Sequence, residues 1–413
     1  MAKFSQDFDL EAVDIIADNG SVYKIKYLVV EVNFFEDIFS FACSGNVVVK
    51  DAIGIIENLK LDGSEIIQIA YGKTTDTAKN IRKFRLYKVG NRNPVGNKTA
   101  EHYTIHFTSE ELFLSEQYKI SKSFKGLEIS TMIWNILVDE NFGLNVPIDR
   151  LKWIEQSYGL YDMVVPKMKP FEAISWLSNY ALPNENSGAD MLFFETKDGF
   201  YFNSLKTLFD SAPLTTYKYQ PSDIDEVKVE NIYTILNYEF IKTYDSLDAT
   251  KSGIYANRVI SIDPISRKKE VTDFTKADLP GYSPGGTALN RFGKFSEEMS
   301  ESHLQLVFSN SYQVQEEYIN QSTGAVAKSI RVETFVPNRT AQIALANYTI
   351  MKAIVPGNSN LTVGRTLNIE IDSLGLTSDA TRENDPYYSG IYLITAVRHV
   401  IQSQGVYLSL IHI

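Results

Sequence analysis

The chain has 413 residues, 44% hydrophobic and 22% charged, which is ordinary for a soluble globular protein of roughly two to four domains. Its formal net charge of −11 argues against a protein that grips nucleic acid by counterion release. The single cysteine, Cys43, excludes an intrachain disulfide, and its apolar surroundings predict a small buried thiol rather than a nucleophile. The N-terminus lacks the apolar core of a signal peptide, and no uninterrupted apolar window predicts a membrane span, so we expect synthesis in a cytoplasm.

The first 115 residues predict a run of short β-strands. Clusters of Gly, Asn and Pro separate them, which is typical of a closed barrel or a sandwich. The expected strands cover residues 23–27, 29–33, 45–50, 65–71, 83–89 and 102–107, with one helical turn at 55–59. We therefore interpret residues 1–115 as a first β-barrel domain.

Residues 116–212 predict an α+β domain. Apolar residues from Ile129 recur at the spacing of an amphipathic helix through Leu137, and a second helix opens at Pro170 and runs to Ala181. A β-hairpin follows, in which residues 191–195 and 200–203 flank a turn that ends in Gly199.

The remaining 201 residues return to strands. Expected elements are a strand at 217–219, a strand or helix at 232–240, a hairpin of 257–262 with 270–272, a Gly- and Pro-rich loop at 279–286, a helix from about 338 striped by Ala341, Leu345, Tyr348 and Met351, and strands at 366–371, 391–397 and 405–411. We interpret 213–245 plus 326–413 as a second, discontinuous barrel and 246–325 as a small β-rich insertion.

Few residues suggest a chemical site. His102 and His106 lie four residues apart, which in a strand is roughly 13 Å, too far to share one metal ion, so a solvated or interface face is expected. The acidic clusters at 223–226 and 297–301 are expected to be solvated, and the loop at 283–287 lacks the Lys-Ser/Thr of a phosphate loop. Trp134 and Trp176 are expected to pack in helices. The sequence therefore predicts no catalytic, cofactor-binding or metal-binding residues and no cofactor.

Several segments, in order along the chain, resemble the central hub proteins of T-even-type phage baseplates and the hub part of type VI secretion spike proteins. They cover residues 45–52 with Leu59, 123–137, 166–177, 193–205, 355–364 and 390–399, whereas residues 246–325 match no part of that pattern.

The resemblance implies two barrel domains that are similar to tail-tube subunits, with α+β domains inserted between them. Three chains would then present six barrels, in a ring between a threefold spike and a sixfold tail tube. The implied partners are two further copies of the chain, the spike protein, the tube protein and other baseplate proteins, with DNA as transient cargo. The implied location is the virion tail, after assembly in the host cytoplasm.

Two other classes of function stay open at this stage. One is a virion enzyme that cuts cell-wall polymer with carboxylates from separate segments, which a turbidity assay on peptidoglycan would reveal. The other is a β-rich adhesion module that binds surface glycans through exposed aromatic side chains, which a glycan array would detect.

Overall fold

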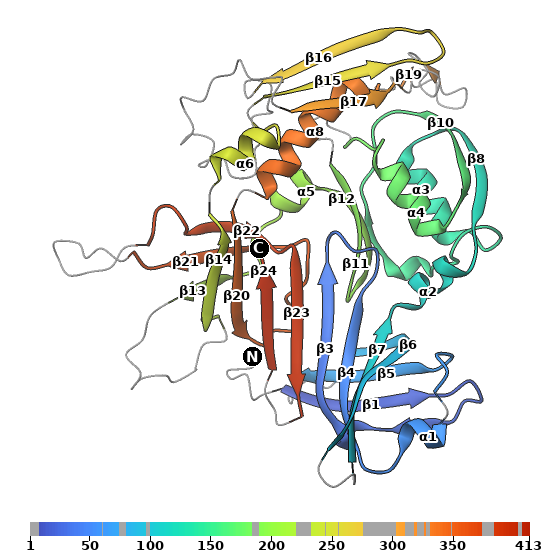
Figure 1. Ribbon diagram of the computed structural model, residues 1–413, viewed down its shortest axis with the longest axis vertical. Helices are drawn as coiled ribbons and strands as arrows, with labels where there is room; N and C mark the ends of the chain where they lie inside the picture. Colours follow the sequence, from blue (N-terminus) through green and yellow to red (C-terminus); the bar gives the residue numbers. More distant parts are fainter. Residues whose placement is uncertain are drawn as a thin grey trace, which may run out of the picture.

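A computed structural model describes residues 8–59, 61–73, 80–95, 100–183, 190–219, 233–243, 245–254, 256–275, 303–309, 318–319, 326–327, 331–347, 349–373, 384–403 and 407–413. The prediction of a strand-rich α+β chain is confirmed, because strands form several sheets and the helices cover parts of them (Figure 1). The predicted loop at 279–286 and both acidic clusters lie outside the described residues.

One antiparallel sheet of eleven strands forms the body of the molecule. Its order is β14 (Asn237–Lys242), β20 (Ile350–Pro356), β24 (Tyr407–His412), β23 (Ala396–Gln402), β3 (Val29–Asp37), β4 (Ser44–Asp51), β7 (Ala100–Thr108), β6 (Asn80–Val95), β5 (Ile66–Lys73), β1 (Phe8–Ile16) and β2 (Val22–Lys24). The pairing of β3 with β23 joins strands from the two ends of the chain. Among the described residues, no strand pairing closes either half of this sheet into a barrel of its own.

The N-terminal half folds over its own core because β6 turns a corner. Its first residues pair with β5, its later residues pair with β7, and the register shifts twice along the way, between Leu86 and Lys88 and between Gly90 and Asn93. Such bulges bend a strand and increase its twist. Strands β1 and β5 consequently lie across β3, β4 and β7 (Figure 1), and alternate side chains such as Val47, Ile69 and Phe107 fill the space between.

Two local predictions in this half differ from the structure in detail. The expected strand at 23–27 is a short strand, β2, followed by a 3₁₀ turn, η1 (Lys26–Leu28), since Ile25 turns its backbone towards Val13. The helical turn expected at 55–59 is confirmed as α1 (Ile55–Leu59), whose first amides are held by the carboxylate of Asp51.

The C-terminal half has a second core. Strands β13 (Thr216–Tyr219), β21 (Thr366–Ile371) and β22 (Gly390–Leu393) form a small sheet that packs on β20, β23 and β24 through Leu367, Ile369, Met351 and Val397. The single strand expected at 391–397 is wrong: it is two strands, because the chain leaves β22 and enters the large sheet as β23.

The unit between these halves confirms the two predicted helices and the hairpin. Helices α3 (Ile129–Val138) and α4 (Pro170–Ser178) pack against the pair β8 (Ile120–Leu127) and β10 (Tyr161–Met168). The hairpin is β11 (Met191–Thr196) with β12 (Gly199–Ser204), to which β9 (Leu151–Ile154) adds in parallel. Helix α2 (Glu110–Gln117), the turn η2 (Ile148–Arg150) and helix α5 (Leu205–Phe209) complete the unit.

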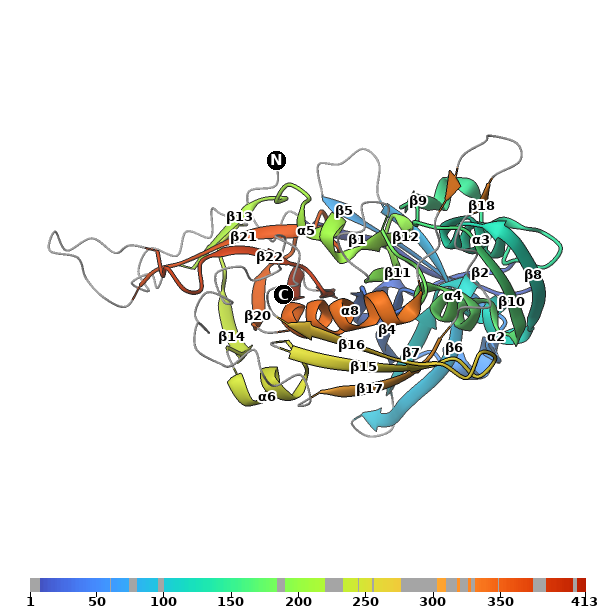
Figure 2. The ribbon, with the colours of Figure 1, turned by 90° about the horizontal axis from the view of Figure 1, so that it is seen from above.

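A three-stranded sheet with one helix on it lies at the top of Figure 1. Its strands are β16 (Lys269–Thr275), β15 (Ala256–Ile262) and β17 (Leu304–Phe308), and the predicted hairpin of β15 with β16 is confirmed. Helix α8 (Val332–Ala346) lies along this sheet in Figures 1 and 2, and Asn257 Nδ2 donates to the carbonyl of Pro337 at 3.0 Å. Helix α6 (Ser246–Lys251) precedes the sheet, and β18 (Tyr318–Ile319) pairs with β19 (Val326–Ala327).

The expected start of the third helix is wrong by six residues. Helix α8 begins at Val332 rather than near Asn338 and contains Pro337. Its first turns are stabilised by Val332 and Phe335, which pack against Leu182 of the α+β unit. Met351, expected on the same helix, lies instead on strand β20; Tyr348 lies outside the described residues.

Candidate functional site

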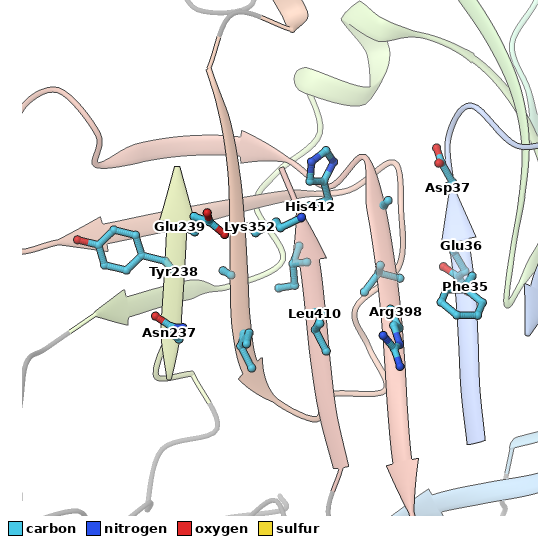
Figure 3. A pocket seen from close by; sticks show the side chains of 15 residues that line it. Phe35, Glu36, Asp37, Asn237, Tyr238, Glu239, Lys352, Arg398, Leu410 and His412 are labelled. Carbon is cyan, nitrogen blue, oxygen red and sulfur yellow. The ribbon is translucent and has the colours of Figure 1, made fainter. Parts of the chain in front are cut away.

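A hollow with a volume of about 450 Å³ lies on the open face of the eleven-stranded sheet. Strands β14, β20, β24, β23 and β3 form its floor, as Figure 3 shows. Cross-strand pairing sets its side chains in rows, one of which runs from Ile354 through Leu410 and Arg398 to Phe35. A parallel row runs from Lys352 through His412 and Ala396 to Asp37.

A hydrogen-bonded polar network crosses this face where the two ends of the chain meet. Arg398 Nε donates to Asn33 Oδ1 at 2.9 Å, and Asn33 Nδ2 donates to Glu31 Oε1 at 2.8 Å and to Asn46 Oδ1 at 3.0 Å. Gln402 Nε2 donates to Glu31 Oε2 at 3.2 Å. The network therefore ties β23, β3 and β4 together on the open face, and it satisfies both ends of the buried Asn33 amide.

The charges around the hollow are mixed. Its lining includes the acidic residues Asp37 and Glu239 and the basic residues Lys352 and Arg398. Burial, followed by the nearby Lys352, lowers the pKa of His412. The surface is therefore not a basic one of the kind that binds a phosphate backbone.

A buried ionic junction joins the α+β unit to the large sheet. Glu195, on β11, is fully buried and forms an ion pair with Arg150, while Arg82 Nη2 lies 3.8 Å away. The same carboxylate accepts a hydrogen bond from the backbone N–H of Cys43 at 2.7 Å. Arg150 also pairs with Glu111 at 2.6 Å, and burial raises the pKa of Glu111.

A second buried carboxylate, Glu36 of β3, links three segments. It accepts hydrogen bonds from Lys197 N at 2.7 Å, Thr362 Oγ1 at 2.7 Å and Val363 N at 3.3 Å. Burial raises the pKa of Glu36, although the Thr362 hydrogen bond and nearby cations oppose that rise. These two carboxylates thus fix β3, β11 and the connection after β20 in one arrangement.

The groups of the junction are engaged in contacts within the chain. Each of its carboxylates is held by backbone amides or cations, and Cys43 is buried with its Sγ 3.4 Å from the Glu195 carbonyl oxygen. Burial, followed by the charge of Glu195, raises the pKa of this thiol well above its usual value, so the nucleophilic thiolate is disfavoured. The predicted buried thiol is confirmed.

The structure also places the other candidates from the sequence. His102 and His106 lie with Thr104 on one half-exposed face of β7, and Tyr103, Ile105 and Phe107 are buried on the other, as expected. In the part of the chain that is described, no group of three or more His, Cys, Asp or Glu side chains could hold a metal ion.

The tryptophans divide between packing and exposure. Trp176 packs edge-on against Tyr180 with ring centroids 5.4 Å apart, and Trp134 is half-buried in α3. Trp153 lies on β9 and is 50% exposed. Within the described ranges, no helix is long and apolar enough to cross a membrane.

Sequence reasoning missed the roles of Glu36, Arg82 and Glu195. One signal was present: Glu36 and Glu195 each follow two phenylalanines within an apolar strand, where a charged side chain requires a partner when it is buried. The partners themselves come from distant segments and could not be identified from spacing.

Comparisons with known proteins connect this architecture to phage tails. No family model matches the chain. It is 24% identical over 382 residues to the probable baseplate hub protein gp334 of Vibrio phage KVP40, covering 87% of this chain and 83% of that protein.

Two solved structures share the fold over nearly their whole length. One is a tail protein from Neisseria meningitidis MC58, with a TM-score of 0.53, 10% identity and coverage of 97% of this chain and 95% of that one. The other is the 43 kDa tail protein of prophage MuSo2 from Shewanella oneidensis, with a TM-score of 0.52, 6% identity and 97% coverage of both chains. The resemblance to the baseplate hub proteins of contractile tails is therefore confirmed, and it extends over most of the chain.

Proposed function

We propose that this chain is a structural, non-enzymatic baseplate hub located in a phage virion tail. Three copies form a ring that links a threefold spike to a sixfold tail tube and leaves a channel for DNA. The observation that carries the proposal is the pairing of β3 with β23, which sets two strand-rich halves side by side in one chain. Three such chains supply six halves, which is what a threefold-to-sixfold adaptor requires.

The two hydrophobic cores support a division of the chain into two tube-like units. One core is formed by residues of the first 107 positions with Ile401 and Tyr407. The other is formed mainly by the C-terminal strands with Tyr217 and Ile235, and Ile38, Phe194, Leu205 and Leu208 join it from the neighbouring units. We propose units at 1–115 and at 213–245 plus the C-terminal strands, with 116–212 as the α+β unit. Because α8 packs on β15 and β16, we place it with the small unit that begins at 246.

The charge distribution supports a channel rather than a nucleic-acid grip. The chain carries a net charge of −11, and the open sheet face combines acidic residues with the basic residues Lys352 and Arg398. A surface of this kind allows DNA to pass without the phosphate contacts that dominate stable binding. The spike, the tube protein and other baseplate proteins are the proposed partners, and no cofactor is needed.

The test is the mass and shape of the purified full-length chain in solution. Light scattering is expected to give about three times 46.7 kDa, and negative-stain images are expected to show a ring with a central hole. The same measurement is repeated after mixing with the neighbouring spike and tube proteins. A chain that stays monomeric alone and in that mixture contradicts the proposal.

A further inference from the structure

The three-stranded sheet β16-β15-β17 exposes an apolar face on the side opposite α8. Leu304, Leu306 and Phe308 of β17 are 54%, 71% and 77% exposed, and all three side chains point to the same side because they alternate with Gln305 and Val307. Gln305 points the other way, since its Nε2 lies 3.1 Å from Thr340 Oγ1 on α8. One face of this sheet is therefore covered and the other is not.

The neighbouring strands continue the exposed face. Ile260 lies beside both Leu306 and Val271, and Ile262 lies beside Phe308. Val271 is 52% exposed and Ile262 is 41% exposed. Monomeric proteins rarely present such a contiguous group of large apolar side chains, and groups of this kind mark interaction sites.

The backbone of β17 adds a second feature, an open strand edge. Within the described residues β17 pairs only with β15. His303 O accepts from Arg258 N at 2.9 Å and Ser309 N donates to Ile262 O at 3.0 Å, so the odd-numbered residues face β15. The N–H and C=O groups of Leu304, Leu306 and Phe308 therefore point outward, where an extended chain can pair with them.

The exposed charge at the end of the sheet where Phe308 lies is positive, in contrast to the net charge of the chain as a whole. The turn between β15 and β16 carries Arg267 and Lys268, and Lys269 begins β16; all three are exposed. Lys269 lies opposite Ile262, which in turn lies beside Phe308. Glu270, the next residue, is paired with Arg331 at 3.5 Å. A basic turn at the same end of an apolar sheet face complements an apolar segment that carries acidic residues.

We propose that β17 and the exposed face beside it form a docking surface for an extended, acidic segment of another protein. The segment adds to the sheet as a fourth strand, places alternate apolar side chains over Leu306 and Phe308, and brings its carboxylates to the turn at 267–269. A lipid surface is a poorer occupant, since its hydrocarbon region offers no hydrogen-bond partners to the open edge. This surface belongs to a different sheet from the eleven-stranded one, and the inference goes beyond the proposed ring function.

The experiment measures fluorescence anisotropy of labelled synthetic peptides with the full-length chain. The test peptide alternates valine and threonine and has glutamates at both ends. A glutamate carboxylate therefore lies near the basic turn at 267–269 whichever direction the added strand runs. One control peptide has lysines in place of the glutamates. A second has prolines in place of two central threonines and cannot add as a strand.

The wild-type chain is expected to bind the acidic peptide saturably and the two control peptides about tenfold more weakly or worse. L306S/F308S is expected to weaken binding of the acidic peptide by about tenfold, because it removes apolar contact without adding charge. The matched control, I148S/V164S, alters two side chains that are 64% and 62% exposed on other elements and is expected to bind as the wild type does. K268E/K269E is expected to reverse the preference to the lysine peptide.

Equal binding of the three peptides, or no saturable binding, overturns the proposal, and this comparison uses only the wild-type chain. Sedimentation of the same samples separates the other occupants. Self-association that L306S/F308S abolishes assigns the surface to a second copy of the chain and overturns the proposal. Vesicle binding that L306S/F308S abolishes, with phosphatidylserine vesicles, assigns it to a membrane. An L306S/F308S sample that keeps the wild-type mass but loses the peptide shows that this surface and the ring are independent.

Discussion

Replacing Glu195 by Gln tests whether the buried ionic junction holds the α+β unit on the large sheet. The substitution keeps the side-chain volume but removes the charge that faces Arg150 and Arg82, whose side chains are 31% and 13% exposed. Removing one partner of a buried ion pair costs about 3–5 kcal/mol, because the other charge stays buried and uncompensated. Arg150 keeps Glu111 as a partner at 2.6 Å, so we expect the lower end, about 3 kcal/mol.

The assay is differential scanning calorimetry with urea unfolding as a second measure. If the junction unfolds in a cooperative unit of about 200 residues, a loss of about 3 kcal/mol lowers Tm by roughly 6–12 °C. The matched control is E101Q, which breaks the exposed pair of Arg92 with Glu101, whose side chains are 44% and 39% exposed. Such a surface pair contributes about 0–1 kcal/mol. If E195Q lowered the Tm by only about one or two degrees relative to the wild type, as E101Q is expected to do, the reasoning would be refuted.

Three further predictions concern other buried groups. Burial lowers the pKa of His399 from 6.5 to about 4, so as pH falls the unfolded state takes up a proton before the folded state does. The free energy of unfolding therefore decreases by about 1.4 kcal/mol per pH unit between pH 6.5 and 4, and urea unfolding of H399Q should show a shallower decrease over that range. Burial raises the pKa of Asp190 from 3.8 to about 7, so the stability contributed by the protonated side chain is lost as pH rises from 3.8 through 7. D190N should therefore unfold at a higher urea concentration than the wild type at pH 8, but not at pH 4. In G45A the new methyl group would overlap the Phe107 ring and the Asn33 carbonyl, which should lower the free energy of unfolding by about 1–3 kcal/mol. An unchanged urea midpoint would show that β3, β4 and β7 shift to accommodate the methyl group.

Local periodicity predicted the elements whose partners are also local. The stripe from Ile129 to Leu137 is α3, and the hairpin with Gly199 in its turn is β11 with β12, because each pattern follows the face that the element buries. The alternation along β7 likewise predicted which side chains are buried. In these cases the sequence separation between interacting residues is small, so spacing alone determines the structure.

Predictions were wrong or incomplete where distant segments decide the outcome. The break between β22 and β23 depends on which of two sheets each strand joins, and the early start of α8 depends on Leu182 of the α+β unit. The junction around Glu195 gathers Arg82, Arg150 and Cys43 from three separate segments. No spacing rule specifies contacts of that kind, because many alternative partners have the same residue type.

The pairing of β3 with β23 also delays the completion of the large sheet until late in synthesis. Asn33 and its partner Arg398 are 365 positions apart, so β3 leaves the ribosome long before the strand that covers its edge exists. At about 5–20 residues per second, the edge of β3 waits for roughly 20–70 s. During that interval β3 presents unpaired backbone groups to other nascent chains. The yield of native protein should therefore depend on the concentration of nascent chains and on temperature.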